Sequence, residues 1–94
     1  MIDNRSYMII LYDYYGGLLN DKQQEYFENY YFDNLSLGEI SDNLEVSRNA
    51  VHKTLKSVEE KLEFYEERLR LYEKSKKIEE VLDRDSLEKI KDLY

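Results

Sequence analysis

The segment Ser36–Leu55 constrains the fold more than any other part of the chain, because it predicts two short helices joined by a tight turn. Ser36 followed three residues later by Glu39 is a capping box, in which each side chain accepts a backbone N–H at a helix start. Ser47 is a second candidate N-cap. Apolar residues recur at helical spacing on both sides of the turn: Leu37, Ile40 and Leu44, then Val51, Leu55 and Val58. The pattern predicts a helix-turn-helix over residues 36–58.

The second of these helices has a basic exposed face. Between Ser47 and Ser57 it contains three basic residues and no acidic residue, a composition that suits a helix in contact with phosphates and base edges. The candidate residues for binding nucleic acid or another partner are Ser47, Arg48, Asn49, His52, Lys53 and Lys56. A protein-binding surface and a merely solvated helix fit the same pattern, and the sequence leaves these alternatives open.

The overall charge opposes binding of nucleic acid. The 94 residues contain 21 acidic and 14 basic side chains, for a net charge of −7. Residues 1–46 hold nine acidic and two basic side chains, so the first half carries all of the net charge. A polyanion is repelled by this field at long range, and the basic helix would have to outweigh it locally.

Composition excludes several classes of function. The chain has no cysteine and one histidine, so it has neither thiolate chemistry nor the ligands of the usual zinc sites. The apolar run 7–15 is too short to cross a bilayer, and no catalytic or phosphate-cradling motif is present. We therefore predict a cytoplasmic, non-enzymatic protein with no cofactor, no metal, no membrane insertion and no small-molecule substrate.

The whole chain reads as one all-α domain, residues 1–94. Helices are predicted over about 3–15 and 21–33, with Gly16 and Gly17 supplying a positive backbone angle between them and Asn20 with Gln23 forming a capping box. A long C-terminal helix is predicted over about 47–82, with a break in its apolar seam at Lys76. After an interruption at 83–86, a short last helix is predicted over about 87–94.

The long helix carries a heptad seam, Val51, Leu55, Val58, Leu62, Tyr65, Leu69 and Tyr72. This seam either packs against the wide apolar face of the first helix or joins two copies of the chain. We favour a homodimer centred on Leu62, Tyr65, Leu69 and Tyr72, because so short a chain has more apolar faces than its own elements cover.

Two other clusters have ordinary interpretations. The aromatic segment 26–32 is predicted to be core rather than a stacking platform for single-stranded RNA, because its side chains recur at helical spacing. The glutamates after Val58 are predicted to form four-apart ion pairs, Glu66 with Arg70 and Glu73 with Lys77, rather than a catalytic or metal-binding cluster.

The pattern from Tyr7 to Leu82 resembles the YlxM family of small bacterial proteins, whose helix-turn-helix is similar to region 4 of sigma factors and has no wing. The residues that carry the resemblance are Leu19, Lys22-Gln23, Tyr30-Tyr31, Ser36–Ile40, Val46–Arg48 and Ala50-Val51. The resemblance implies a non-enzymatic accessory or regulatory protein of the signal recognition particle pathway, with the particle's GTPase or its RNA as partner.

The alternative is a sequence-specific DNA-binding transcriptional regulator. A dimer of this kind would read half-sites one helical turn apart, about 34–36 Å, with Arg48 and Asn49 on base edges and Lys53 and Lys56 on phosphates. The chain departs from the family pattern at His52-Lys53, where it is more basic. It also departs at Glu45, where a non-glycine residue in the turn leads us to expect a slightly opened corner.

Overall fold

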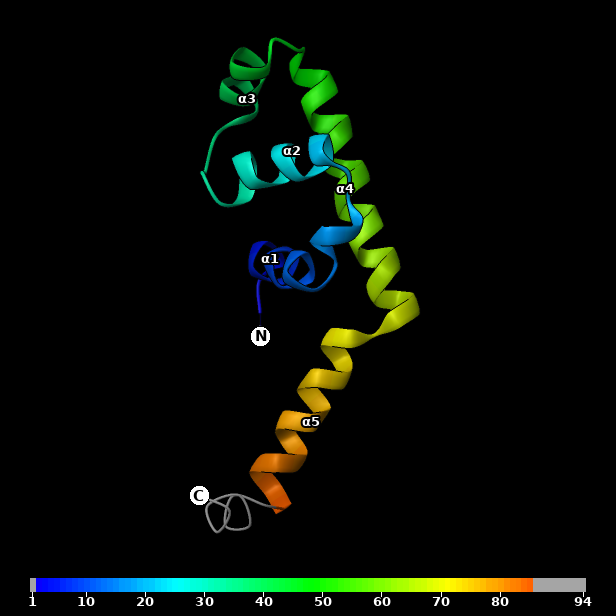
Figure 1. Ribbon diagram of the computed structural model, residues 1–94. Helices are drawn as coiled ribbons and strands as arrows, with labels where there is room; N and C mark the ends of the chain where they lie inside the picture. Colours follow the sequence, from blue (N-terminus) through cyan, green and yellow to red (C-terminus); the bar gives the residue numbers. More distant parts are fainter. Residues whose placement is uncertain (1, 86–94) are drawn as a thin grey trace.

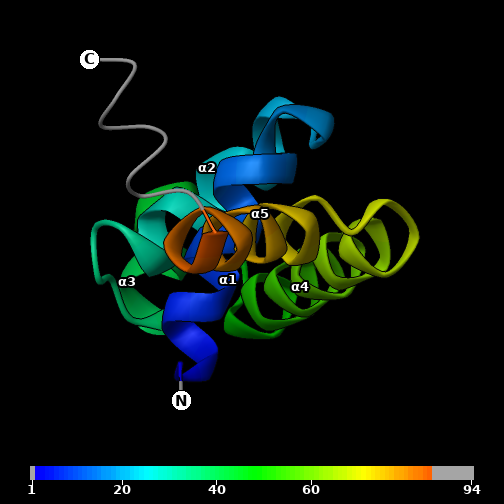
Figure 2. The ribbon, with the colours of Figure 1, turned by 90° about the horizontal axis from the view of Figure 1, so that it is seen from below.

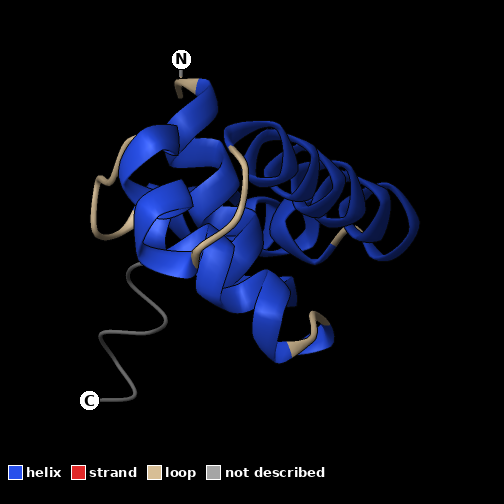
Figure 3. Cartoon of the chain, turned by 90° about the horizontal axis from the view of Figure 1, so that it is seen from above, coloured by secondary structure: helices blue, strands red, loops and turns tan. Residues whose placement is uncertain are grey.

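The described part of the chain is entirely helical. A computed structural model describes residues 2–85, and within this range there is no strand (Figure 3). The all-α prediction is confirmed. The elements are α1 (Asn4–Tyr15), the 3-10 turn η1 (Gly16–Leu18), α2 (Asp21–Tyr31), α3 (Leu37–Leu44), α4 (Arg48–Leu69) and α5 (Leu71–Asp85).

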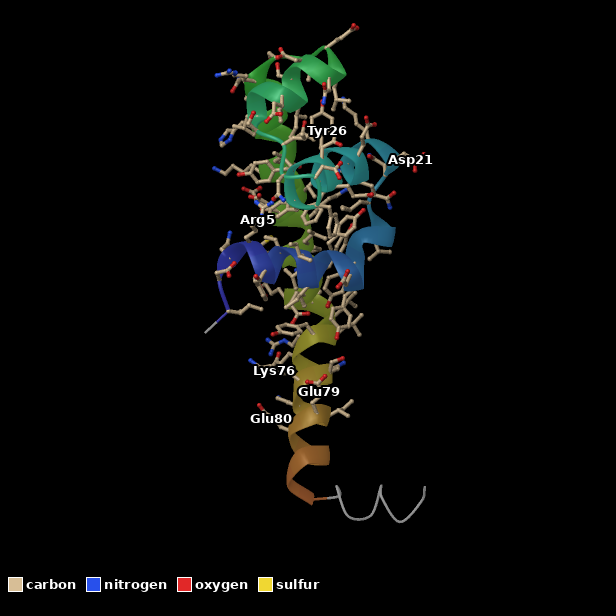
Figure 4. All side chains as sticks on the ribbon, turned by 90° about the vertical axis from the view of Figure 1, so that its left-hand side faces the viewer. Arg5, Asp21, Tyr26, Lys76, Glu79 and Glu80 are labelled. Carbon is tan, nitrogen blue, oxygen red and sulfur yellow. The ribbon has the colours of Figure 1, made fainter. Side chains whose placement is uncertain are left out.

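Helix α4 contacts each of the helices α1, α2 and α3. Helices α3, α2 and α1 are stacked in that order along one side of α4, and its opposite side is uncovered (Figures 1 and 4). Helix α5 turns back beneath α1, as the view from below shows (Figure 2), and then projects past the body of the molecule. Lys76, Glu79 and Glu80 lie on this projecting part (Figure 4). The molecule is accordingly elongated, 57 × 25 × 25 Å.

Side-chain caps fix where the helices begin. Asn20 with Gln23 and Ser36 with Glu39 form complete capping boxes, and the Ser47 hydroxyl accepts the N–H of Ala50 at 3.0 Å. All three predicted caps are confirmed. Such caps depend only on neighbouring residues, and each is worth about 1 kcal/mol.

The predicted positive backbone angle after α1 is wrong. Gly16 has φ −56° and ψ −33°, and no glycine of the described chain has a positive φ. The chain leaves α1 through the turn η1 instead. Gly16 is needed for space, because a Cβ there would lie 2.9 Å from Cε2 of the Tyr12 ring.

The buried stripe of α4 holds two clusters of core residues together. Val51 and Leu55 pack with Ile40 of α3 and Tyr26 of α2. Further along α4, Val58 and Leu62 pack with residues of α1 and α2, namely Met8, Leu11, Tyr15, Phe27 and Tyr31. The seam of α4 therefore packs within its own chain as far as Leu62. The aromatic segment 26–32 contributes Tyr26, Phe27 and Tyr31 to this core, as predicted.

Arg5 ties α1 to the end of α2. Its guanidinium donates hydrogen bonds to the carbonyl oxygens of Tyr30 at 2.9 Å and Tyr31 at 3.0 Å, and to Oδ1 of Asn34. It also lies 5.5 Å and 5.2 Å from the centroids of the Tyr30 and Tyr31 rings. A cation at a helix C-terminus is favourable because the last carbonyl groups have no partner within the helix. In Figure 4 the Arg5 label lies between α1 and α2.

The predicted continuous helix over 47–82 is wrong, because the helix is interrupted at Arg70. Arg70 has a left-handed backbone, φ 54° and ψ 36°, which ends α4 at Leu69 and starts α5 at Leu71. Helix α5 continues through Lys76, where only the apolar seam was predicted to break, and it runs to Asp85, so the interruption predicted at 83–86 is not found as far as Asp85. The last predicted helix, over about 87–94, lies outside the described residues.

The buried carboxylate of Glu66 explains the break. It accepts the Tyr15 hydroxyl at 2.6 Å and the N–H groups of Tyr72 and Glu73 at 3.1 and 3.2 Å. The Tyr15 hydroxyl in turn accepts the N–H of Leu71 at 3.0 Å. The first three amides of α5 are thus satisfied by side chains of α1 and α4, which favours a new helix start over continuation of α4.

Two predicted ion pairs therefore have different outcomes. Glu66 does not pair with Arg70, because its carboxylate accepts backbone N–H groups of α5. Arg70 forms an ion pair with Glu73 instead, at 3.3 Å. The Glu73–Lys77 pair is confirmed at 3.5 Å. Burial and the hydrogen bond to Glu66 raise the pKa of Tyr15, so its hydroxyl remains a donor at neutral pH.

We expect Glu66→Gln to lower the free energy of unfolding by about 1.5–3 kcal/mol, the range for hydrogen bonds to a charged group. The substitution places an NH2 group against donors that need an acceptor. Glu67→Gln is the matched control, because Glu67 is exposed and the chemical change is the same. Urea unfolding measures both. Equal stability of the two variants would contradict the role given to Glu66.

Candidate nucleic-acid interface

The turn between α3 and α4 is closed by local contacts. Glu45 has a left-handed backbone, φ 56° and ψ 45°. The N–H of Val46 donates to the Ser41 carbonyl at 3.1 Å, and the Ser41 hydroxyl donates to the Val46 carbonyl. The expected opening of the corner is wrong, because these two bonds hold Glu45 in the conformation that glycine usually supplies. Helices α3 and α4 therefore form a closed helix-turn-helix.

The first half of α4 presents a basic surface, which we define as Arg48, Asn49, His52, Lys53 and Lys56. All five residues are exposed, whereas Val51 and Leu55 of the same turns are buried in the cluster shared with α3. Ser47 is also exposed, but its hydroxyl is occupied by the cap of α4. The structure thus brings the predicted binding residues together as exposed positions on the first turns of one helix.

The Arg48 guanidinium lies close to Gly38 of α3. A Cβ at Gly38 would lie 2.7 Å from Nη2 and 3.2 Å from Cζ of Arg48, so the guanidinium rests directly over the backbone of α3. The absence of a side chain at Gly38 lets the cation fold across the helix-turn-helix.

The cations of the basic surface have no carboxylate partner within the described residues. The ion pairs in that part of the chain are Arg70–Glu73, at the junction of α4 and α5, and Lys77–Glu73, within α5. The charges of Arg48, Lys53 and Lys56 are therefore available to a ligand without breaking an existing pair.

A hollow of about 330 Å³ borders one side of the basic surface, where α2, α3 and α4 meet. It is lined by Tyr30, Leu37, His52, Leu55, Lys56 and Glu59. Glu59 accepts the hydroxyl of Tyr31, and burial together with this bond raises the pKa of Tyr31 above its ordinary value of 10.0. This side of the surface therefore combines two basic groups with a carboxylate.

The four residues predicted for a dimer interface differ in how much of each side chain is exposed to solvent. Leu62 is fully buried in the core of its own chain, and Tyr65 and Tyr72 are partly buried against that core. Leu69 is 45% exposed. Of the four residues, Leu69 is the one that the single chain leaves most available to a second copy.

Sequence reasoning did not associate Lys22 with this region. Lys22 stands on α2, 31 positions before Lys53 in the chain, yet both line one hollow beside the basic surface. No periodicity or motif relates the two positions, because their proximity depends on how α2 packs on α4.

No helix of the described chain is long and apolar enough to span a membrane.

A closed turn, two capped helices and a second helix with one buried and one exposed side define a helix-turn-helix protein. Comparison with known proteins agrees. Residues 2–93 match the model of the UPF0122 family, described as a helix-turn-helix protein, YlxM / p13 like. The chain belongs to this family, and the resemblance to YlxM proteins is confirmed.

Several relatives support this assignment. The chain is 54% identical over 59 residues to a UPF0122 protein of Thermoanaerobacter sp. (strain X514), covering 63% of this chain and 50% of the relative. It is 52% identical over 60 residues to one of Caldanaerobacter subterraneus, covering 64% and 51%. For one of Shouchella clausii the values are 49% over 59 residues, covering 63% and 54%. The matched part of this chain spans about half the length of these curated relatives.

We expect Glu45→Gly to raise the free energy of unfolding by about 0.5–1 kcal/mol, because the left-handed conformation costs a non-glycine residue about 1–2 kcal/mol and part of this gain is offset by the freer unfolded chain. Asp42→Gly, at an exposed helical position of α3, should instead lower it by a similar amount. Thermal or urea unfolding of both variants gives the two signs. A loss of stability in Glu45→Gly would contradict the geometry of the turn.

Proposed function

We propose that this chain is a non-enzymatic regulatory protein that binds nucleic acid through the basic surface of α4. The observation that carries the proposal is the placement of exposed cations, free of carboxylate partners within the described residues, on the second helix of a closed helix-turn-helix. This is the helix that enters a groove in helix-turn-helix complexes with DNA.

The mechanism follows from charge. Arg48, Lys53 and Lys56 would neutralise phosphates and release their counterions, and this release is the main source of affinity in such contacts. Asn49 and the guanidinium of Arg48 would supply donors that can reach base edges. The net charge of −7 opposes approach, and added salt screens this repulsion, so the affinity should fall less steeply with salt than that of a basic protein with more phosphate contacts.

The resemblance to YlxM proteins points to the signal recognition particle pathway as the setting, with its RNA or its GTPase as partner. In the first case the basic surface meets phosphates of a folded RNA. In the second it meets an acidic patch of the GTPase, which complementary charge would orient. The cytoplasm is the compartment that this proposal requires.

The alternative is a transcriptional regulator that reads duplex DNA. It uses the same helix, with Arg48 and Asn49 on base edges and Lys53 and Lys56 on phosphates. A duplex of selected sequence should then bind far more tightly than random duplex. The RNA hypothesis predicts instead that the folded RNA binds more tightly than any duplex DNA of equal length.

Titration of fluorescent signal recognition particle RNA and of duplex DNA with the chain tests these proposals. We expect Lys53→Glu to weaken binding of the preferred nucleic acid by about tenfold or more, since it removes one phosphate contact and adds a charge that repels the phosphate. Lys74→Glu is the matched control, because it changes net charge equally on exposed α5. If Lys53→Glu binds like Lys74→Glu, or neither nucleic acid binds at all, the basic surface is not a nucleic-acid interface.

We also propose that the chain forms a homodimer, with Leu69 at the interface. Exposed Leu69 and Leu71, at 45% and 41%, flank the break at Arg70, and a second copy would remove both side chains from water. Two copies would present two basic surfaces at a fixed separation.

We expect Leu69→Asp to convert a dimer to a monomer in sedimentation at micromolar concentration. Leu18→Asp is the control, because Leu18 is also exposed, at 57%, and lies outside the proposed interface. An unchanged mass for Leu69→Asp would contradict the proposed interface.

A further inference from the structure

We infer that Lys22 of α2 and Lys53 of α4 form a clamp for one backbone phosphate of the nucleic acid that the basic surface binds. The inference rests on the proposed function and extends the binding site to a helix outside the helix-turn-helix. It is carried by the hollow of about 300 Å³ between the start of α2 and the middle of the exposed side of α4.

The lining of this hollow consists of hydrogen-bond donors and cations. It contains two lysines, two carboxamides and two hydroxyls, and no carboxylate: Asn20, Lys22, Gln23, Lys53, Thr54 and Ser57. Lysines and hydroxyl groups are frequent phosphate ligands in protein–nucleic acid complexes. Two neighbouring hollows differ, because each includes a carboxylate, Glu59 in one and Glu39 in the other. An anion is therefore best accommodated between Lys22 and Lys53.

The capping box of α2 orients two carboxamides of this lining. The Asn20 side-chain oxygen accepts the N–H of Gln23 at 2.8 Å, and the Gln23 side-chain oxygen accepts the N–H of Asn20 at 3.1 Å. Each carboxamide oxygen thus has one of its two lone pairs occupied within the protein. The NH2 groups of both side chains are donors that an anion can use.

The position of the hollow suits a phosphate of a ligand already held by α4. Lys53 belongs both to the basic surface and to this lining. A nucleic acid seated on the first half of α4 has its backbone on either side of the helix. The side toward the start of α2 offers Lys22, whereas the side toward the end of α2, beside Tyr30, offers Glu59 next to Lys56. The Lys22 ammonium lies 5.8 Å from the centroid of the Tyr26 ring, a contact that limits where the exposed lysine can reach.

The test is the salt dependence of binding of the nucleic acid that the titration above selects. We expect Lys22→Ala to reduce the slope of log K against log salt concentration by about 0.9 for duplex DNA or about 0.7 for a single strand, the change for one lost phosphate contact. Lys74→Ala removes the same charge from exposed α5 and should leave the slope unchanged. Because one phosphate is shared, Lys22→Ala combined with Lys53→Ala should weaken binding by less than the product of the two single effects.

The possible results distinguish failure of the Lys22–Lys53 clamp from failure of the basic surface to bind nucleic acid. If wild-type chain binds with a salt-dependent affinity but Lys22→Ala keeps the wild-type slope, like Lys74→Ala, the clamp is wrong and the basic surface stands. If the two lysine effects multiply independently, Lys22 contacts a different phosphate and the shared clamp is again wrong. If the wild-type chain shows no salt-dependent binding, both the clamp and the proposed function are wrong.

Discussion

Every other part of the structure depends on the burial of one stripe of α4. Val51, Leu55, Val58 and Leu62 are at most 4% exposed, and they join α3, α2 and α1 to the same helix. Full burial of such a side chain is worth about 1.5–3 kcal/mol, a large contribution in a small domain whose net stability is only about 5–15 kcal/mol. Because the stripe takes up one side of α4, the opposite side is left uncovered along its length (Figure 1).

The two ends of α4 differ in what their polar side chains do. At the N-terminal end, the basic surface lies beside α3 and the start of α2, where the structure offers donors and cations to a ligand. At the C-terminal end, Glu66 turns its carboxylate inward and stops the helix by accepting the amides of α5. The break is therefore stabilised by a tertiary contact with Tyr15 of α1, and it directs α5 back beneath the body (Figure 2).

The sequence predicted what depends on neighbouring residues and missed what depends on folding. The caps at Asn20, Ser36 and Ser47 and the helix-turn-helix follow from local hydrogen bonds and spacing, and they are confirmed. The break at Arg70 was missed because heptad spacing continues through it, while its cause, the contact of Glu66 with Tyr15, joins positions 51 residues apart. Gly16 was misread because a close aromatic ring, rather than a backbone angle, requires it.

In the candidate site, too, some features could be predicted from neighbouring residues and others depend on how the helices pack. Exposure of Arg48, Asn49, His52, Lys53 and Lys56 could be read from the stripe that alternates with them. The placement of Lys22 beside Lys53 and of Arg48 over Gly38 could not, since both depend on the packing of separate helices.

We propose that the exposed side of the first half of α4 binds a nucleic-acid ligand, whereas Leu62 and Glu66 in its second half stabilise the fold. Amide chemical shifts of the isotopically labelled chain, recorded during titration with the preferred nucleic acid, test this proposal most directly. We expect the largest changes at residues 47–57 and 20–23, and small changes at Leu62 and Glu66. Changes concentrated on α5, or spread evenly through the core, would contradict it.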